Sequence, residues 1–253
     1  MQSRPDMLGV RPFSREVIHL PSGLTLEASL SVPSEASPAA ENKLAICLHP
    51  WSWLGGRMDD PCVTHCWSTY SRIALNLGSG YHVLRYNSRG VGNSSGWPSL
   101  TGIQEANDLQ EVVQWALGAI PSVSSLVVLG YSHGSLIASL FPILPETSNV
   151  RVSHILLSYP LGPRSWLTAF HGKHYASVLN NLIRDPRSNV LVAYGNQDEF
   201  TGISSYTSLA DDLRREAQGR DNLQIVQVDG ANHFWVDDVA RGRMLGVVQD
   251  WVP

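Results

Sequence analysis

The sequence has few cysteines, only three in 253 residues: Cys47, Cys62 and Cys66. Three thiols cannot form the disulfide framework that stabilises many small secreted proteins, so their number favours a reducing compartment. Cys62 and Cys66, with His65 beside them, resemble part of a metal cluster, but no fourth ligand is evident and a free cysteine is usually a small buried residue. We therefore expect no metal site.

Long apolar runs and basic clusters are absent as well. Residues 1–13 are polar with scattered apolar side chains, unlike a signal peptide, and no segment approaches the length of a membrane span. The formal net charge is −4, and no group of Lys and Arg is dense enough to bind a phosphate backbone. We expect a cytoplasmic protein that neither binds nucleic acid nor inserts stably into a membrane.

Nucleotide-binding motifs are also missing. The sequence contains no Gly-Lys-Ser/Thr phosphate loop. Gly90 and Gly92 resemble the start of a dinucleotide loop, but the third glycine, Gly96, falls one place late and no helix is predicted to begin there. We expect no nucleotide, nicotinamide or flavin cofactor.

Apolar residues are plentiful, at 43% of the chain, and their pattern predicts strands that alternate with helices. The predicted strands are 16–20, 24–32, 44–48, 81–86, 125–129, 154–158, 190–194 and 223–228. The predicted helices are 61–76, 102–117, 133–143, 165–182, 204–217 and 236–251. The last six strands have few charges, as strands buried on both faces should.

This order of elements predicts an α/β fold. The first two strands flank Pro21-Ser22-Gly23, which is typical of an antiparallel hairpin. The strand-helix alternation that follows implies a mostly parallel sheet covered by helices. Residues 33–41, rich in Ser, Pro and Ala, indicate a surface loop rather than a linker, so we predict one domain spanning 1–253.

The pattern Gly-x-Ser-x-Gly occurs twice, centred on Ser94 and Ser132, and alone it is a weak signal. Ser132 follows the predicted buried strand 125–129 and precedes a predicted helix, which is the strand-turn-helix frame of a nucleophile elbow. Ser94 is followed by Trp97 and Pro98, with no helix predicted to begin there. We predict that Ser132 is a nucleophile and that Ser94 lies in an ordinary turn.

A serine hydroxyl becomes a strong nucleophile only when a neighbouring base takes its proton. On elbows of this kind, the acid and the histidine follow the serine in chain order. His233 is the only histidine after His174, and it follows the last predicted strand. Asp198, just after strand 190–194, is the predicted acid, with Glu199 as the local alternative. The competing interpretation is that both are ordinary polar loop residues.

Acyl transfer also needs two N–H donors for the tetrahedral oxyanion. The amide of His133, directly after Ser132, is one predicted donor. The loop after strand 44–48 supplies the other, and because Pro50 has no N–H, the amide of Trp51 is the better candidate. The alternative for this loop is a simple turn.

Tryptophan is frequent, with eight residues. Trp53, Trp166 and Trp235 are predicted to bind substrate and, with Trp51 and Trp97, to form an apolar wall near the site. Packing where loops meet the core is the alternative for each of them.

Together these residues resemble the α/β-hydrolase superfamily, and within it small members with little or no lid, similar to dienelactone hydrolases and serine-aminopeptidase-like esterases. The resemblance rests on the segments 49–56, 85–94, 130–134, 195–198 and 232–233. It implies an eight-stranded sheet whose first strands are antiparallel, and a structural role for the loop around Arg89. One departure is His49-Pro50, where many members have His-Gly. The usual place of a lid holds only residues 161–189.

The predicted function is that of a serine hydrolase, cleaving an ester-like bond of a small acyl substrate through Ser132, His233 and Asp198. An acyltransferase or a C–C bond hydrolase would use the same three residues. A binding protein that keeps the fold without turnover is the alternative from another class.

Overall fold

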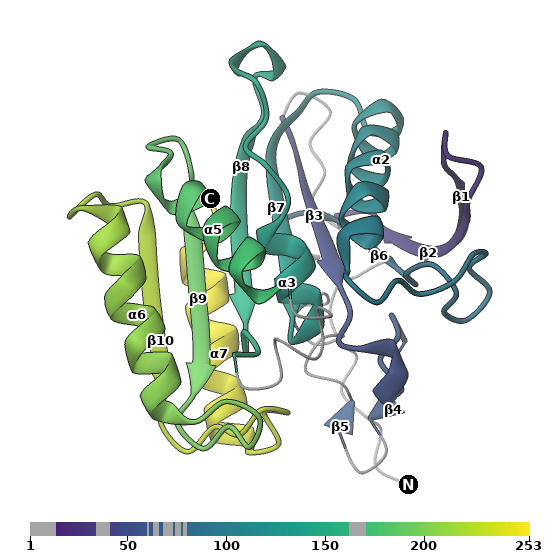
Figure 1. Ribbon diagram of the computed structural model, residues 1–253. Coiled ribbons are helices and arrows are strands. Elements are labelled where there is room, and N and C mark those ends of the chain that lie inside the picture. Colours follow the sequence, from purple (N-terminus) through teal and green to yellow (C-terminus); the bar gives the residue numbers. More distant parts are fainter. Residues whose placement is uncertain are drawn as a thin grey trace, which may run out of the picture.

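The structure, a computed structural model, describes residues 14–33, 41–59, 61–62, 66–67, 73, 77, 80–161 and 171–253. The strands of its main sheet are β1 (Ser14–His19), β2 (Thr25–Ser31), β3 (Asn42–Leu48), β6 (His82–Tyr86), β7 (Val123–Tyr131), β8 (Arg151–Leu157), β9 (Val190–Gly195) and β10 (Leu223–Val228). They form an eight-stranded sheet of order β1-β2-β6-β3-β7-β8-β9-β10 (Figure 1). Every strand predicted from the sequence is present, with shifts of a few residues at the ends.

The strand directions agree with the predicted α/β fold. β1 pairs antiparallel with β2, and β2 pairs antiparallel with β6. From β6 to β10 each neighbouring pair is parallel. The carboxyl ends of these parallel strands therefore meet at one edge of the sheet, where loops can bring distant residues together.

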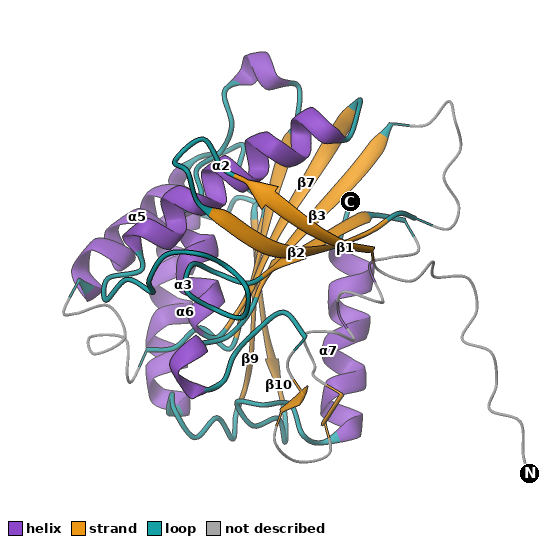
Figure 2. Cartoon of the chain, turned by 90° about the vertical axis from the view of Figure 1, so that its right-hand side faces the viewer, coloured by secondary structure: helices purple, strands orange, loops and turns teal. Residues whose placement is uncertain are grey.

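Helices cover both faces of the sheet. They are α2 (Ile103–Ala119), α3 (His133–Ser139), α5 (Gly172–Arg184), α6 (Ile203–Ala217) and α7 (Asp238–Trp251). Figure 2 shows α2, α3, α5 and α6 on one side of the strands and α7 on the other. Because both faces are covered, every residue of β9, which lies between β8 and β10, is buried, and this explains why its sequence is almost wholly apolar.

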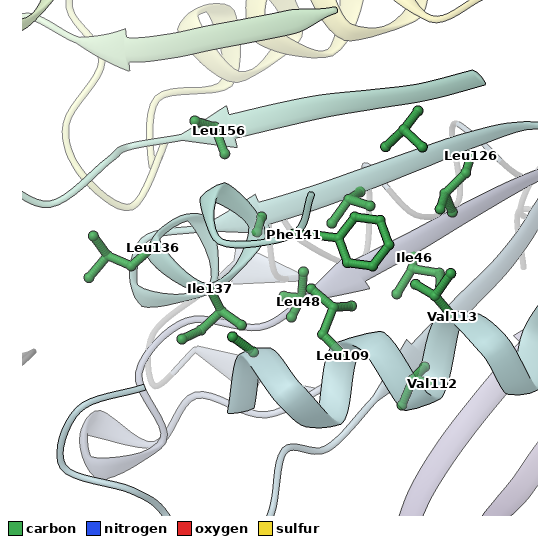
Figure 3. Packing of buried hydrophobic residues seen from close by; sticks show 14 of the residues in the cluster. Ile46, Leu48, Leu109, Val112, Val113, Leu126, Leu136, Ile137, Phe141 and Leu156 are labelled. Atoms are coloured by element: carbon green, nitrogen blue, oxygen red, sulfur yellow. The ribbon is translucent and has the colours of Figure 1, made fainter. Parts of the chain in front are cut away.

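Two clusters of buried side chains hold these layers together. On the face covered by α2 and α3, Leu109 and Ile137 pack with the strand residues Ile46 and Leu126 (Figure 3). On the opposite face, Met244 of α7 is fully buried in a second cluster with β7 and β9. The sheet is thus held rigidly from both sides, and the loops at its carboxyl edge project from a packed base.

Two predicted helices differ from the observed elements. The sequence predicts a helix over residues 61–76. Instead, Pro61–Cys62 (β4) and Cys66–Trp67 (β5) pair as antiparallel strands, so the prediction is wrong for the first part of this segment. Proline suits either the first turn of a helix or the end of a strand, so Pro61 does not distinguish a helix from a strand at this position. Ile73 is helical and buried, as expected. His65, and with it the Cys-His-Cys cluster, lies outside the described residues.

α3 ends four residues earlier than the predicted helix 133–143. Pro142 follows closely, and the residue before a proline is driven away from helical dihedrals. The predicted helix 165–182 begins in residues outside the description, and α5 covers its second part.

No helix in the described ranges is long and apolar enough to cross a bilayer.

Candidate active site

Ser132 occupies a sharp turn between β7 and α3. Its dihedrals are φ 53° and ψ −121°, a conformation that costs an L-residue energy and is retained only where the surroundings impose it. Its amide donates to Leu157 O at 2.9 Å, which ties the turn to β8. The strained turn matches the expected elbow and lifts the hydroxyl above the carboxyl edge of the sheet.

The two glycines of the motif allow the elbow to close. A Cβ on Gly130 would overlap the carbonyl oxygen of Gly134, so strand and helix touch at this point. A Cβ on Gly134 would lie 2.5 Å from Leu48 O and 2.7 Å from His49 O. The start of α3 is therefore packed directly against the chain that leaves β3.

His233 reaches Ser132 from the loop after β10. His233 Nε2 lies 2.9 Å from Ser132 Oγ, across 101 residues of sequence. His233 Nδ1 lies 2.7 Å from Asp198 Oδ2. With the Nδ1 proton facing the carboxylate, the serine hydroxyl donates to Nε2. The structure thus brings the three predicted side chains into one hydrogen-bonded row, and all three are buried.

The loop that presents His233 is fixed by its backbone. The carbonyl oxygen of His233 accepts from Tyr131 Oη at 2.9 Å and from Ser158 Oγ at 3.3 Å. Its amide donates to Glu199 Oε2 at 3.0 Å. Gly195 permits a close approach to this loop, because a Cβ there would overlap Ala231 O. The predicted alternative acid, Glu199, therefore holds the histidine's backbone, whereas Asp198 holds its ring.

The carboxylate of Asp198 is fully used. Oδ1 accepts from the amides of Phe200 and Thr201 at 2.8 and 2.9 Å, and Oδ2 accepts from Tyr206 Oη at 2.9 Å as well as from His233. Burial alone raises the pKa of Asp198, but the hydrogen bond and charge of His233, and then the bonds from Tyr206 and Phe200, outweigh it and hold the pKa below its usual value. The group is ionised at neutral pH.

The predicted oxyanion donors lie on two segments that the Gly134 contact joins. As the first residue of α3, His133 has an amide without a partner inside its own helix, and that amide points out of the helix N-terminus. Trp51 follows β3 in an extended conformation and precedes a short 3-10 turn, Ser52–Leu54. Its carbonyl accepts from the Gly56 amide at 3.1 Å, which closes the loop.

His49 shapes this loop as a neutral side chain. Ser88 N donates to its Nε2 at 3.1 Å, so Nδ1 carries the proton and donates to Pro50 O at 2.6 Å. Burial lowers the pKa of His49 to about 4. Burial, followed by repulsion from His49 when that ring is protonated, lowers the pKa of His133 to about 4 as well. Both rings are uncharged at neutral pH, and the ring nitrogens of His49 are both engaged in hydrogen bonds that hold the loop.

Ser94, the other motif serine, has a structural role. Its hydroxyl donates to Asn87 O at 2.7 Å and accepts from the amide of Glu27 at 2.9 Å. Nearby, Arg89 makes a two-pronged ion pair with Asp108 of α2, at 2.6 and 2.7 Å. The loop after β6 is therefore bonded to β2 and α2.

The predicted substrate-binding tryptophans have three different outcomes. Trp53 is 62% exposed and stacks on Trp51, with ring centroids 6.0 Å apart. Trp166 lies outside the described residues. Trp235 is fully buried and donates its indole N–H to Ser158 Oγ at 2.9 Å, so it packs in the core instead of facing a substrate. The prediction for Trp235 is wrong because the chain turns inward there, at φ 55°.

Sequence reasoning missed three residues of this site: Tyr206, Phe200 and Tyr131. Tyr206 lies in a helix and no motif marks it. Phe200 stands two positions after the predicted acid Asp198, and its ring centroid lies 4.7 Å from that of His233. Only its place in the loop just after Asp198 could have indicated it.

Solved structures with the same architecture come from several bacteria and an archaeon. The chain is similar to an α/β serine hydrolase without a lid, XC6422 from Xanthomonas campestris, with 21% identity, 96% of each chain covered and a TM-score of 0.67. It is similar to the esterase Pf2001 of Pyrococcus furiosus, with 18% identity, 99% of this chain and 95% of that chain covered and a TM-score of 0.66. The fold is therefore the α/β-hydrolase fold.

The sequence itself identifies the family. Residues 23–155 match the X-Pro dipeptidyl-peptidase (S15) family. The chain is also 34% identical over 193 residues to the uncharacterized protein RP471 of Rickettsia prowazekii (strain Madrid E), which corresponds to 76% of this chain and 71% of that protein. The chain belongs to the S15 family.

Proposed function

We propose that this protein is a serine esterase that cleaves a carboxylic ester through an acyl-enzyme formed on Ser132. The observation that carries the proposal is the row of hydrogen bonds from Asp198 through His233 to Ser132, at 2.7 and 2.9 Å. Such a row lets the imidazole take the serine proton while the carboxylate stabilises the charge that results.

In the first step, Ser132 Oγ attacks the ester carbonyl as its proton passes to His233 Nε2. The amides of His133 and Trp51 stabilise the oxyanion, in the region where the N-terminus of α3 meets the loop after β3. The carbon–oxygen bond to the leaving alcohol then breaks. The proton on Nε2 passes to the alcohol oxygen, and the acyl group stays on Ser132.

In the second step, water replaces the alcohol. His233 takes a proton from water, the hydroxide attacks the acyl carbon, and the Ser132 oxygen leaves with the proton from Nε2. Asp198 keeps its charge throughout, which its low pKa favours.

Covalent labelling by a fluorescent fluorophosphonate tests this proposal without a known substrate. We expect the wild type to be labelled and Ser132→Ala to remain unlabelled, because only an activated hydroxyl displaces fluoride from the probe. Ser94→Ala is the matched control, since its hydroxyl is bonded within a loop, and it should be labelled like the wild type. Labelling that survives in folded Ser132→Ala, or a folded wild type without labelling, contradicts the proposal.

A peptide amide bond is the second candidate substrate, because the S15 family takes its name from an X-Pro dipeptidyl-peptidase. Amides and esters pass through the same acyl-enzyme, so the triad does not separate them. The two candidate substrates are separated by measuring turnover of Ala-Pro-p-nitroanilide beside that of p-nitrophenyl acetate. A higher kcat/KM for the anilide identifies a peptidase, and turnover of the acetate without any turnover of the anilide identifies an esterase.

A further inference from the structure

The aromatic rings of two phenylalanines, Phe200 and Phe234, pack against the ring of His233. The ring centroid of Phe200 lies 4.7 Å from that of His233, and the ring of Phe234 lies 5.4 Å away, edge to face. The two phenylalanine rings also contact each other edge to face, at 5.7 Å. The three rings therefore form one cluster beside the base.

The outer side of this cluster faces solvent, although the histidine does not. Phe200 is 38% exposed and Phe234 is 39% exposed, whereas His233 is 4% exposed. Large apolar side chains left open beside a reactive group are candidates for contact with a ligand. Each ring therefore offers apolar area that a bound molecule can cover.

The chemistry of the proposed esterase reaction says which part of a substrate meets this surface. His233 Nε2 delivers its proton to the oxygen of the departing alcohol, so that oxygen must lie within hydrogen-bond reach of the histidine ring. The rest of the alcohol extends from this oxygen. The acyl portion stays bonded to Ser132 and receives no proton from His233 in this step. The alcohol is thus the part of the substrate that lies next to the rings packed on His233.

We propose that Phe200 and Phe234 form the leaving-group subsite of this enzyme and select esters whose alcohol carries an aromatic or bulky apolar group. This inference rests on the proposed esterase function. Offset and edge-to-face contacts with the two rings stabilise an aromatic alcohol in the transition state, while a methyl group covers little of their surface. The acyl half of the substrate is not selected by these residues.

The test compares benzyl acetate with methyl acetate. The two esters have the same acyl group, and their leaving alcohols have similar acidity. We expect the wild type to prefer the benzyl ester, and Phe200→Ala with Phe234→Ala to lower the benzyl-to-methyl ratio of kcat/KM roughly tenfold. Methyl phenylacetate against methyl acetate probes the acyl side, and its ratio should stay within about twofold in the same variant. Val17→Ala, on an exposed apolar residue of edge strand β1, is the matched control and should keep both ratios.

Three results overturn the subsite. They are a wild type without preference for the benzyl ester, a variant that loses activity equally on both acetates, and a change confined to the acyl-side ratio. Equal loss would mean that the two rings only shield the histidine from water. These results leave the proposed function intact as long as the wild type turns over either acetate and is labelled on Ser132. Absence of turnover and labelling in the wild type overturns the proposed function itself.

Discussion

Asp198 Oδ2 accepts two hydrogen bonds, one from His233 and one from Tyr206. The tyrosine ring is buried and stacks on Tyr194, with ring centroids 4.2 Å apart and ring planes 7° from parallel. Burial, and then the charge of Asp198, raises the pKa of Tyr206 well above its usual value, so the hydroxyl remains a donor at every working pH. Tyr206 is therefore a positioning residue that draws charge away from the oxygen facing the imidazole.

Tyr206→Phe tests this role at the scale of one hydroxyl. The substitution keeps the stacked ring and removes the donor, which leaves more negative charge on Asp198 to stabilise the imidazolium. We expect the acid midpoint of the kcat/KM–pH profile to move to higher pH by roughly 0.5, with kcat on the plateau changed less than about tenfold. A loss of kcat at an unchanged midpoint would show that the hydroxyl is merely structural.

At the scale of elements, the site depends on how closely α3 approaches β3. Gly134 makes this possible because its Cα lies over the backbone of Leu48 and His49. The same contact sets the distance between the two predicted oxyanion donors, which belong to different segments. Local packing and the geometry of the site are therefore governed by one residue.

Gly134→Ala should separate the helix from the strand. Its Cβ would meet two carbonyl oxygens of the backbone, which cannot rotate away as a side chain does. We expect a loss of about 1–3 kcal/mol in the free energy of unfolding and a fall in kcat/KM of at least about tenfold.

Gly118→Ala is the control for this substitution. Gly118 lies in α2 with nothing within 4 Å of a Cβ, so alanine there should raise stability by up to about 1 kcal/mol and leave activity unchanged. Thermal and urea unfolding measure the stability of both variants, and kcat/KM measures their activity. Equal stability of Gly134→Ala and wild type would refute the steric argument.

At the scale of the whole molecule, buried neutral histidines link folding to pH. His154, in β8, is fully buried and bonds Phe141 O through Nε2 at 2.9 Å. Its Nδ1 is buried and has no hydrogen-bond partner among the described residues. Burial lowers the pKa of His154 to about 4, and the pKa values of His49 and His133 are lowered to about 4 as well.

These depressed values predict the direction of the pH dependence. Between pH 6.5 and 4 the unfolded chain binds protons that the folded chain excludes, so stability is fully present above about pH 6.5 and is lost as the pH falls toward 4. Each such group contributes a slope of up to about 1.4 kcal/mol per pH unit within this window.

His154→Gln isolates one of these groups. Glutamine retains a donor for Phe141 O but does not titrate, so the variant should lose less free energy of unfolding than the wild type between pH 7 and pH 5, by roughly 1–2 kcal/mol. Urea titrations at the two pH values measure this difference. Parallel losses in both proteins would contradict the assignment to His154.

Much of the candidate site was predictable because its residues are marked by chain order. Ser132 stands between a buried strand and a helix, Asp198 follows a strand, and His233 is the last histidine, so the expected row could be named before any contact was known. Tyr206 and Phe200 carry no such mark. Trp235 was misplaced for a related reason, since whether an aromatic side chain in a loop turns inward or outward depends on space elsewhere in the molecule.

The sequence by itself determined the strands of the main sheet and most of the helices, since the burial of each residue relative to its near neighbours produces an apolar period that can be read along the chain. Only the tertiary structure decided that β3 lies between β6 and β7, and that residues 101 positions apart share a hydrogen bond. Those contacts arise from strand pairing and from the close fit of Gly134 and Gly195 against backbone of other segments. Such fits depend on the shapes of both partners, and neither local stretch of sequence contains that information.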